Sequence, residues 1–161
     1  MSQKDKVLEL LKKISPLPIQ KRRNITDDRQ GNNRGVVLGK VYSWAPNISG
    51  EQGYIMGRRT NTLKYSKLFK EACKLMEIDN PDFKFTSIQI NDNHRASKHI
   101  DSNNVGESYI IGLGDYDGGE IRIYDEGGDK FYDFDIKNTW HRFNGSILAH
   151  ETLPFSGERF S

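Results

Sequence analysis

Hydrophobic residues recur at helical spacing in two segments of the N-terminal half. The apolar side chains of residues 4–14 fall on one helical face, which predicts an amphipathic helix. Ser15-Pro16 ends it, because the residue before a proline disfavours helical backbone. Residues 62–76 repeat the same apolar spacing and predict a second helix.

The rest of the N-terminal half shows one strand pattern between polar stretches. Residues 36–43 (VVLGKVYS) predict a strand. Residues 16–35 are polar, contain two prolines and predict a connector. Residues 45–61 contain Pro46 and three glycines with little periodicity, so they predict a loop.

From Phe83 onward, short runs rich in Ile, Tyr, Phe and Thr alternate with clusters of Asp, Asn and Gly. Asp117-Gly118-Gly119 and Glu126-Gly127-Gly128 are hairpin-type turn signals. Helices followed by many short strands predict an α+β fold, and the number and spacing of the strands favour a jelly roll over a parallel sheet. The predicted strands are 85–90, 108–114, 120–125, 130–136 and the stretches around 141–151.

Chain length and charge limit the domain organisation and the kinds of partner that the chain can have. The 161 residues predict a single domain, with helical support and loops in 1–80 and a strand-rich core in 81–161. The 24 Lys and Arg residues nearly balance the 22 Asp and Glu residues, so the chain lacks a global basic field for gripping nucleic acid. Two local clusters, Lys21-Arg22-Arg23 and Arg58-Arg59, are the candidate basic patches.

Cysteine content and hydropathy bear on the compartment. Cys73 is the only cysteine, so no internal disulfide can form, and a buried inert thiol is the simplest interpretation. The sequence carries no recognisable secretory signal and no apolar run that would span a membrane. We therefore expect an intracellular protein, cytoplasmic or nuclear, with no membrane partner.

The candidate chemistry centres on His99 and Asp101. In an extended segment, residues i and i+2 point to the same side, so these two side chains can face one point. Two histidines and one carboxylate form the facial triad of non-haem iron(II) sites, which leaves coordination positions open. A second histidine must come from elsewhere, and His150 and His141 both lie in strand-like stretches. His94 lies in the loop before the pair, where a surface or substrate-edge role is the simpler interpretation.

Arg159 and Ser161 add a second candidate group. Arginine presents a planar fork that matches a carboxylate. Ser161 lies two residues later, so it shares the same strand face and adds a hydroxyl donor. The pair predicts a clamp for the distal carboxylate of 2-oxoglutarate.

An HxD pair, a later His and an RxS sequence in this order resemble the 2-oxoglutarate/iron(II)-dependent dioxygenase superfamily. The surrounding residues are similar to the branch that contains the TET and base-J-binding-protein oxygenases and their viral and algal relatives. The residues that carry this likeness are Asn91, His99-Ile100-Asp101-Ser102-Asn103-Asn104, Gly106-Glu107-Ser108-Tyr109, Gly112-Leu113-Gly114, Gly118-Gly119-Glu120, Trp140, Phe143-Asn144-Gly145, His150 and Pro154-Phe155-x-Gly157-x-Arg159-x-Ser161.

The resemblance implies a double-stranded β-helix, a form of jelly roll, with the N-terminal helices packed on it. It implies that His99, Asp101 and His150 hold Fe(II), and the flanking motifs favour His150 over His141. The residues implied for the co-substrate are Arg159 on the C5 carboxylate of 2-oxoglutarate, Ser161 assisting, and Asn91 and Tyr109 in further contacts.

The implied activity is hydroxylation of a C–H bond with O2 and 2-oxoglutarate, supported by ascorbate. The branch suggests a methyl group of a pyrimidine base in DNA or RNA, with Asn103 and Asn104 in a loop that borders the substrate. A protein side chain, as for prolyl or lysyl hydroxylases, is the alternative substrate. A non-catalytic jelly-roll binding module and a cupin-type metalloenzyme without 2-oxoglutarate are the other classes.

Overall fold

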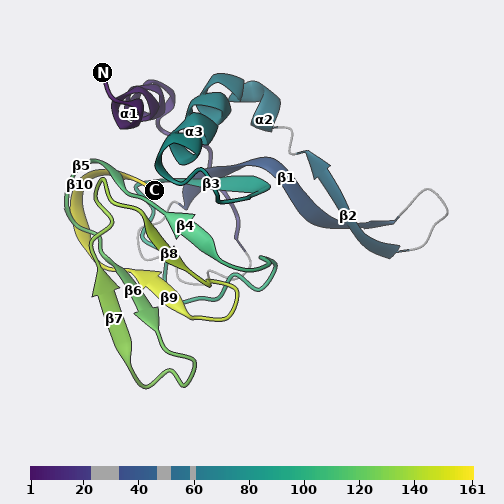
Figure 1. Cartoon of the computed structure of the whole chain (residues 1–161), viewed down its shortest axis with the longest axis vertical. Coiled ribbons are helices and arrows are strands. Elements are labelled where there is room, and N and C mark those ends of the chain that lie inside the picture. The colour runs from purple at the N-terminus through teal and green to yellow at the C-terminus, as the bar shows by residue number, and fades with distance from the viewer. Residues whose placement is uncertain (23–32, 47–51, 59–60) are drawn as a thin grey trace. The chain divides into compact units, whose positions relative to one another are not determined.

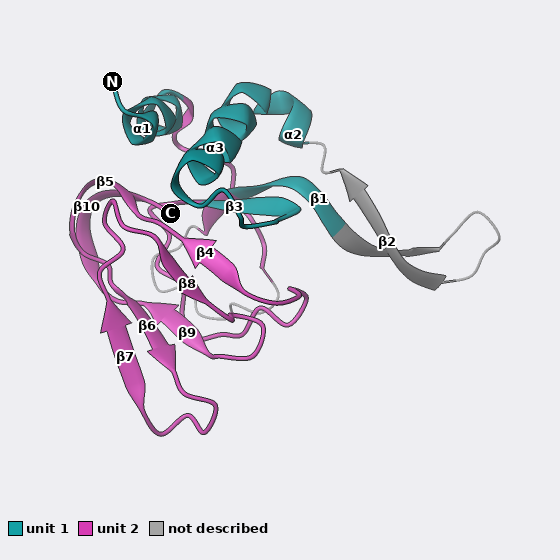
Figure 2. Cartoon of the chain, in the orientation of Figure 1, with its two compact units in different colours: residues 1–13, 36–90 teal, residues 14–35, 91–161 magenta. Residues whose placement is uncertain are grey.

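The computed structural model describes residues 1–22, 33–46, 52–58 and 61–161, with side chains described in these ranges except 42–58. The chain forms two compact units, which are coloured separately in Figure 2. Unit 1 comprises residues 1–13 and 36–90, and unit 2 comprises residues 14–35 and 91–161. Within the described ranges, no helix is long and apolar enough to cross a membrane.

The first helix, α1 (Gln3–Ile14), confirms the prediction made from the apolar spacing of residues 4–14. Val7 and Leu11 are its buried residues. At its start, the Asp5 carboxylate accepts hydrogen bonds from the backbone N–H and the hydroxyl of Ser2, and the Asp5 N–H donates to Ser2 Oγ at 3.1 Å. These reciprocal bonds satisfy groups that the first turn leaves without helical partners.

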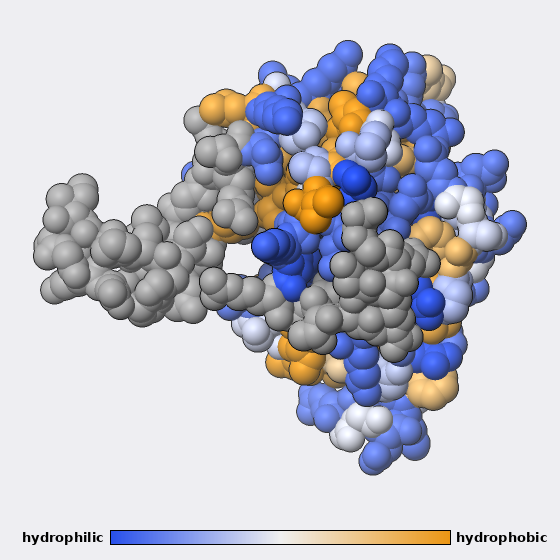
Figure 3. All heavy atoms as spheres, turned by 180° about the vertical axis from the view of Figure 1, so that it is seen from behind, coloured by the Kyte–Doolittle hydropathy of each residue, from blue (hydrophilic) through white to orange (hydrophobic). Residues whose placement is uncertain are grey.

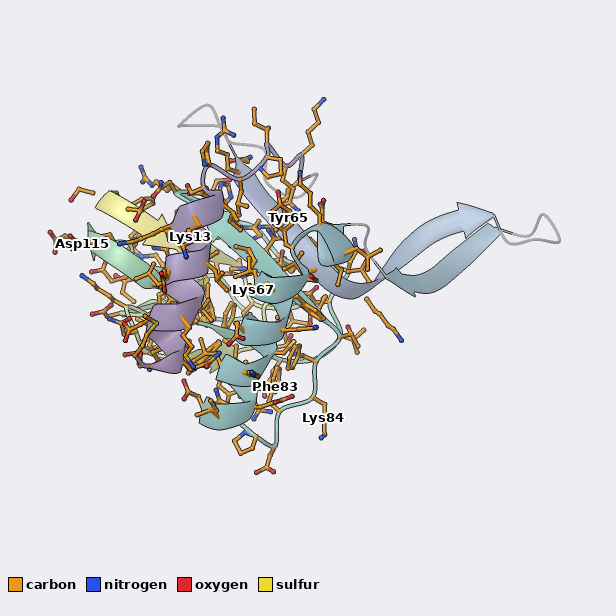
Figure 4. All side chains as sticks on the ribbon, turned by 90° about the horizontal axis from the view of Figure 1, so that it is seen from above. Lys13, Tyr65, Lys67, Phe83, Lys84 and Asp115 are labelled. Atoms are coloured by element: carbon orange, nitrogen blue, oxygen red, sulfur yellow. The ribbon has the colours of Figure 1, made fainter. Side chains whose placement is uncertain are left out.

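The helix predicted over residues 62–76 is two helices in the structure, α2 (Asn61–Lys64) and α3 (Ser66–Asp79). Tyr65 lies between them with φ −110° and ψ 36°, and Figure 4 labels it at this junction. No proline or glycine marks the break, so the apolar spacing alone predicts one continuous helix. The buried residues of α3 are Leu68, Leu75 and Met76.

Three strands precede the C-terminal half. β1 (Arg34–Pro46) confirms the strand predicted at 36–43, and it lies between β2 (Gln52–Arg58) and β3 (Ser87–Asp92). The loop predicted for residues 45–61 is wrong over 52–58, because that segment pairs antiparallel with β1. Backbone pairing supplies its hydrogen bonds whatever the side-chain pattern, so hydropathy alone does not reveal this strand.

The remaining strands, labelled in Figure 1, belong to unit 2, which is magenta in Figure 2. Within it, β10 pairs with β5 and with the end of β3, β4 pairs with β8, and β6 lies between β7 and β9. All these pairs are antiparallel, so the chain combines a few helices with mostly antiparallel strands. Their bounds are β4 (Ser108–Ile110), β5 (Leu113–Gly118), β6 (Ile121–Tyr124), β7 (Phe131–Phe134), β8 (His141–Phe143), β9 (His150–Thr152) and β10 (Phe155–Phe160).

The strand predicted at 108–114 is divided into β4 and β5 in the structure. Gly112 lies between them and forms an isolated parallel bridge with Lys137. Its N–H donates to Ile136 O at 2.8 Å, and its carbonyl accepts from Asn138 N at 2.7 Å. The backbone groups released by the interruption therefore find partners in another segment.

The core of unit 2 follows the alternation in β6. Ile121 and Ile123 point inward, where they pack with Ile136 and Phe143. Burying one such side chain contributes about 1.5–3 kcal/mol. The cluster fixes the inward face of β6, and Ile123 lies directly opposite His150 in the antiparallel register. Core packing thus decides which way the first residue of β9 points.

The face of the molecule drawn in Figure 3 is mainly hydrophilic, with hydrophobic residues in small separate groups. Isolated apolar side chains of this kind are normal on a protein surface. This face therefore offers no broad apolar docking area among the residues that the structure describes.

Candidate metal centre

Two histidines face each other across a backbone bridge. The N–H of His99 donates to the carbonyl of His150 at 3.0 Å, and the N–H of His150 donates to the carbonyl of His99 at the same distance. Residues opposite each other in such a pair point to the same face. Their ring centroids are accordingly 4.3 Å apart, and only 8% of His99 and 5% of His150 are exposed.

Asp101 completes the group. Its Oδ1 lies 3.6 Å from Nε2 of His99, and its Oδ2 lies 3.3 Å from Nε2 of His150. The Asp101 N–H donates to the carbonyl of Gly145 at 2.9 Å, which fixes the backbone at this point. The three ligand atoms lie within 4.8 Å of one another, and no other described residues form a comparable group of three.

The second ring nitrogen of each histidine is engaged. Nδ1 of His99 lies 2.6 Å from the carbonyl oxygen of Ser97, and Nδ1 of His150 lies 2.9 Å from that of Leu148. A carbonyl oxygen can only accept, so each Nδ1 carries a hydrogen, and in the neutral form of such a ring the lone pair lies on Nε2. Metal-binding histidines are typically held in this way. Two lone pairs and one carboxylate thus converge, which is a donor set that fits a cation.

The protonation states favour the same interpretation. Burial raises the pKa of Asp101, but the contact with His150 and the charge of Arg22 outweigh it, and together they lower the pKa to about 2. Burial lowers the pKa of His99, and the neighbouring His150 lowers it further. At neutral pH the carboxylate is therefore ionised and His99 is neutral, as metal binding requires.

His141 lies apart from this group. Its ring stacks on Phe134 with centroids 3.8 Å apart, and its other ring neighbour is Phe143 at 6.2 Å. Phe143 also contacts His150 edge-on, with centroids 4.9 Å apart. Burial lowers the pKa of His141. The structure therefore groups His150 rather than His141 with His99, and the buried His94 is not part of the group either.

Arg159 is a buried cation on β10, with 1% of its surface exposed. Nη2 donates to the carbonyl of Gly119 at 3.1 Å, and Nη1 donates to Ser161 Oγ at 3.4 Å. Nε has no hydrogen-bond partner among the described residues, and no described carboxylate forms an ion pair with the guanidinium. Burial lowers its pKa, because the charge is costly there.

Tyr116 shares this site, although no sequence signal marks it as a partner of Arg159. It lies opposite Gly157 in the β5–β10 register, and Gly157 precedes Arg159 by two residues, so both side chains lie on one face. The guanidinium carbon lies 5.5 Å from the ring centroid of Tyr116. Its hydroxyl is buried without a geometric hydrogen-bond partner among the described residues. The Nε–H of the buried cation and the neighbouring Tyr116 hydroxyl, which interacts with the guanidinium, thus lie together in a buried site, a set that fits a carboxylate ligand.

Gly119 makes room for this cation. A Cβ at this position would lie 2.7 Å from Nε of Arg159 and 2.9 Å from its Cδ. The residue also has φ +70°, a conformation that favours glycine. The turn predicted at Asp117-Gly118-Gly119 connects β5 to β6, but these strands lie in different sheets, so the predicted hairpin does not form there. Its last glycine also borders the Arg159 site.

Two residues predicted for the co-substrate differ in their placement. Ser161 Oγ accepts from Arg159 and from Asn91 Nδ2, the latter at 3.2 Å, so Asn91 belongs to the Arg159 group. Tyr109 lies next to Ile110 on β4 and therefore faces the opposite side from that core residue. Its ring contacts Trp140 edge-on, with centroids 6.0 Å apart.

The predicted substrate loop directly follows Asp101 of the candidate metal centre. Asn103 and Asn104 are exposed, and the Asn104 N–H donates to the carbonyl of Asp101 at 2.9 Å. Of the two basic clusters, Lys21 and Arg22 are described, whereas Arg23, Arg59 and the side chain of Arg58 lie outside the described residues. Lys21 is exposed, and Arg22 forms an ion pair with Asp101 at 3.0 Å.

Comparison with known proteins adds little to this picture. No protein-family model matches the chain, and no curated protein sequence matches it significantly. Among solved structures, the chain is similar to a bsmA homolog from Methylobium petroleophilum PM1, with a TM-score of 0.45 and 13% sequence identity. That match covers 98% of this chain and 78% of the other. A likeness at this level supports no conclusion about fold or function.

Proposed function

We propose that the chain is an Fe(II)- and 2-oxoglutarate-dependent dioxygenase that hydroxylates a C–H bond. The observation that carries the proposal is the convergence of His99, Asp101 and His150, with their ligand atoms within 4.8 Å of one another. A set of two imidazoles and one carboxylate fits iron(II) and leaves positions open for a co-substrate. The engaged Nδ1 atoms of both histidines add support, because they aim Nε2 at the centre.

The Arg159 site supports 2-oxoglutarate as the co-substrate. A buried guanidinium without a described carboxylate partner is costly unless an anion completes it. Nε of Arg159 and the hydroxyls of Tyr116 and Ser161 are suited to hold the C5 carboxylate. A cupin-type metalloenzyme without 2-oxoglutarate would leave this buried cation unexplained.

The strand order of unit 2 supports a double-stranded β-helix. The end of β3, β10 and β5 are neighbours, and β4 pairs with β8 beyond the interruption at Gly112. In the other layer, the His99 segment pairs with β9 at His150, and β9 is followed by β6 and β7. Two layers in this order are what a jelly roll requires. The coarser description, helices with mostly antiparallel strands, does not depend on this proposal.

The residues of the chain have separate roles in the proposed reaction. His99, Asp101 and His150 hold Fe(II), and Arg159 with Tyr116 and Ser161 orients 2-oxoglutarate by its far carboxylate. Fe(II) held there would supply the redox chemistry by which O2 and 2-oxoglutarate give succinate, CO2 and a hydroxylated substrate. Phe143, which contacts His150 edge-on, keeps an apolar wall beside the ligands.

We propose a methyl group of a pyrimidine base in DNA or RNA as the substrate, with a protein side chain as the alternative. The basic cluster at 21–23 supports an anionic polymer over a neutral peptide: the ion pair of Arg22 with Asp101 places this segment beside the proposed metal centre, and the neighbouring Lys21 is exposed. Asn103 and Asn104 follow Asp101 and are exposed, so they are suited to contact a base.

The test is turnover with Fe(II), 2-oxoglutarate and ascorbate. Pools of DNA, RNA and peptides are incubated with the protein, and mass spectrometry records succinate and any oxygen-atom gain in each pool. We expect substrate-dependent succinate and a modified pyrimidine, both lost in Asp101→Ala. Modified peptides alone would establish the alternative substrate. Absence of metal binding and of succinate would refute the enzyme and leave a non-catalytic binding module.

A further inference from the structure

Arg22 reaches the metal ligands from a distant part of the chain. Its Nη2 lies 3.0 Å from Oδ1 of Asp101, a residue 79 positions later. The side chains are only 17% and 23% exposed, so the ion pair is largely shielded from water. No described residue other than Asp101 forms an ion pair with Arg22.

The segment that carries Arg22 is anchored within unit 2. Asp92, 2% exposed, accepts hydrogen bonds from Leu17 N and Ser15 Oγ, both at 2.8 Å. Leu17 is fully buried, and its carbonyl accepts from Nη1 of Arg34 at 2.7 Å. These contacts hold the backbone five residues before Arg22 in a defined place. The guanidinium is therefore presented to Asp101 by an anchored segment rather than by a free arm.

The ion pair divides the two oxygens of Asp101 between different neighbours. Oδ1 accepts from Arg22 at 3.0 Å and lies 3.6 Å from Nε2 of His99, whereas Oδ2 lies closer to a histidine, 3.3 Å from Nε2 of His150. An aspartate without such a partner can rotate and bind a cation through both oxygens. That mode would take up a coordination position that the co-substrate or oxygen needs.

We propose that Arg22 is a positioning residue of the metal centre, which holds Oδ1 of Asp101 and leaves Oδ2 as the oxygen that binds the cation. The inference rests on the proposed function, because it assumes that His99, Asp101 and His150 bind iron. An arginine suits this role, since its planar fork is always charged and fixes the carboxylate plane. A lysine would supply the charge without fixing the plane.

The experiment measures Mn²⁺ affinity by electron paramagnetic resonance and calorimetry in the wild type, Arg22→Ala, Arg22→Lys and Lys21→Ala. Outer partners of metal ligands typically contribute about 10–100-fold to affinity, and we expect a loss of that size in Arg22→Ala. Arg22→Lys should recover part of it. Lys21→Ala, which removes an exposed neighbouring charge, should bind like the wild type.

A second readout reports the coordination itself. In the Co²⁺-substituted protein, the visible absorption depends on the number of ligands, and we expect weaker bands in Arg22→Ala as Asp101 binds through both oxygens. Thermal unfolding confirms that each variant is folded, and Arg22→Lys gives the comparison if the alanine variant is not. Equal Mn²⁺ affinities and identical Co²⁺ spectra in wild type and variants would overturn the role of Arg22 alone. A wild type that binds no Mn²⁺ would overturn the proposed function as well.

Discussion

Replacement of Arg159 with methionine tests the proposed co-substrate site against an ordinary structural role. In the ligand-free protein, an unsatisfied buried polar group costs about 1–3 kcal/mol, and the variant removes Nε, which has no described partner. The variant also loses the bonds to Gly119 and Ser161, each contributing about 1 kcal/mol. These contributions nearly cancel, so we expect the free energy of unfolding to change by less than about 1 kcal/mol.

In contrast to the ligand-free stability, the stabilisation by 2-oxoglutarate should change strongly in Arg159→Met. A ligand present at 100 times its Kd stabilises the wild type by about 2.7 kcal/mol, which raises Tm by about 5–10 °C for a chain of this size. Loss of one partner of a buried charge pair costs about 2–5 kcal/mol. At the same concentration, the stabilisation of Arg159→Met by 2-oxoglutarate should therefore fall below about 1 kcal/mol.

The assay is thermal unfolding with Mn²⁺, with and without 2-oxoglutarate. Phe160→Ala is the matched control, because Phe160 is the next residue on β10, is also 1% exposed, and should cost about 3–5 kcal/mol without ligand. The reasoning is refuted if Arg159→Met loses as much ligand-free stability as Phe160→Ala, since Arg159 would then be a structural residue. An unchanged response to 2-oxoglutarate would refute the carboxylate site.

The remaining predictions concern the metal ligands and one turn. His150→Ala should abolish Mn²⁺ binding in calorimetry, whereas His141→Ala should retain it, and the reverse result would exchange their roles. Gly119→Ala should lower the free energy of unfolding in urea by about 1–3 kcal/mol and weaken 2-oxoglutarate binding, whereas Gly127→Ala, with no contact under 3.6 Å, should change stability by less than about 0.5 kcal/mol. With chelator present, the depressed pKa of Asp101, about 2 against 3.8, gives the wild type about 2 kcal/mol of stability above pH 4 that is lost as pH falls toward 2. Asp101→Asn should lack this loss, and parallel acid-unfolding curves would contradict it.

Local periodicity explains which parts of the fold the sequence predicts. The helix over residues 4–14 and the inward face of β6 follow from side chains that repeat at the period of their element. β2 does not, because it depends on a backbone partner rather than on alternation, and nothing in the side-chain spacing marks the break at Tyr65. The side-chain pattern of a segment indicates which of its faces is buried. It says little about which other strand the segment pairs with.

The same distinction applies to the two candidate sites. His99 and Asp101 could be paired from sequence, because their separation of two residues is enough to place them on one side of an extended segment. Tyr116 and Arg22 could not, since each reaches its partner through strand register or through an anchored connector. No local spacing links Arg22 to a residue 79 positions away.

The arrangement of His99 and His150 depends on both local and long-range contacts. Each Nδ1 lies by the carbonyl two residues earlier, Ser97 for His99 and Leu148 for His150, so the ring orientation is set within three residues of sequence. The position of the rings relative to each other is instead set by the mutual backbone bonds between the two residues. The local contacts orient the two Nε2 atoms, and the backbone bridge brings the rings together. The two histidines are therefore already arranged for binding before a metal ion is present. A cation that binds there should therefore require little rearrangement of the histidines, and the ion pair with Arg22 holds the carboxylate of Asp101 in the same way.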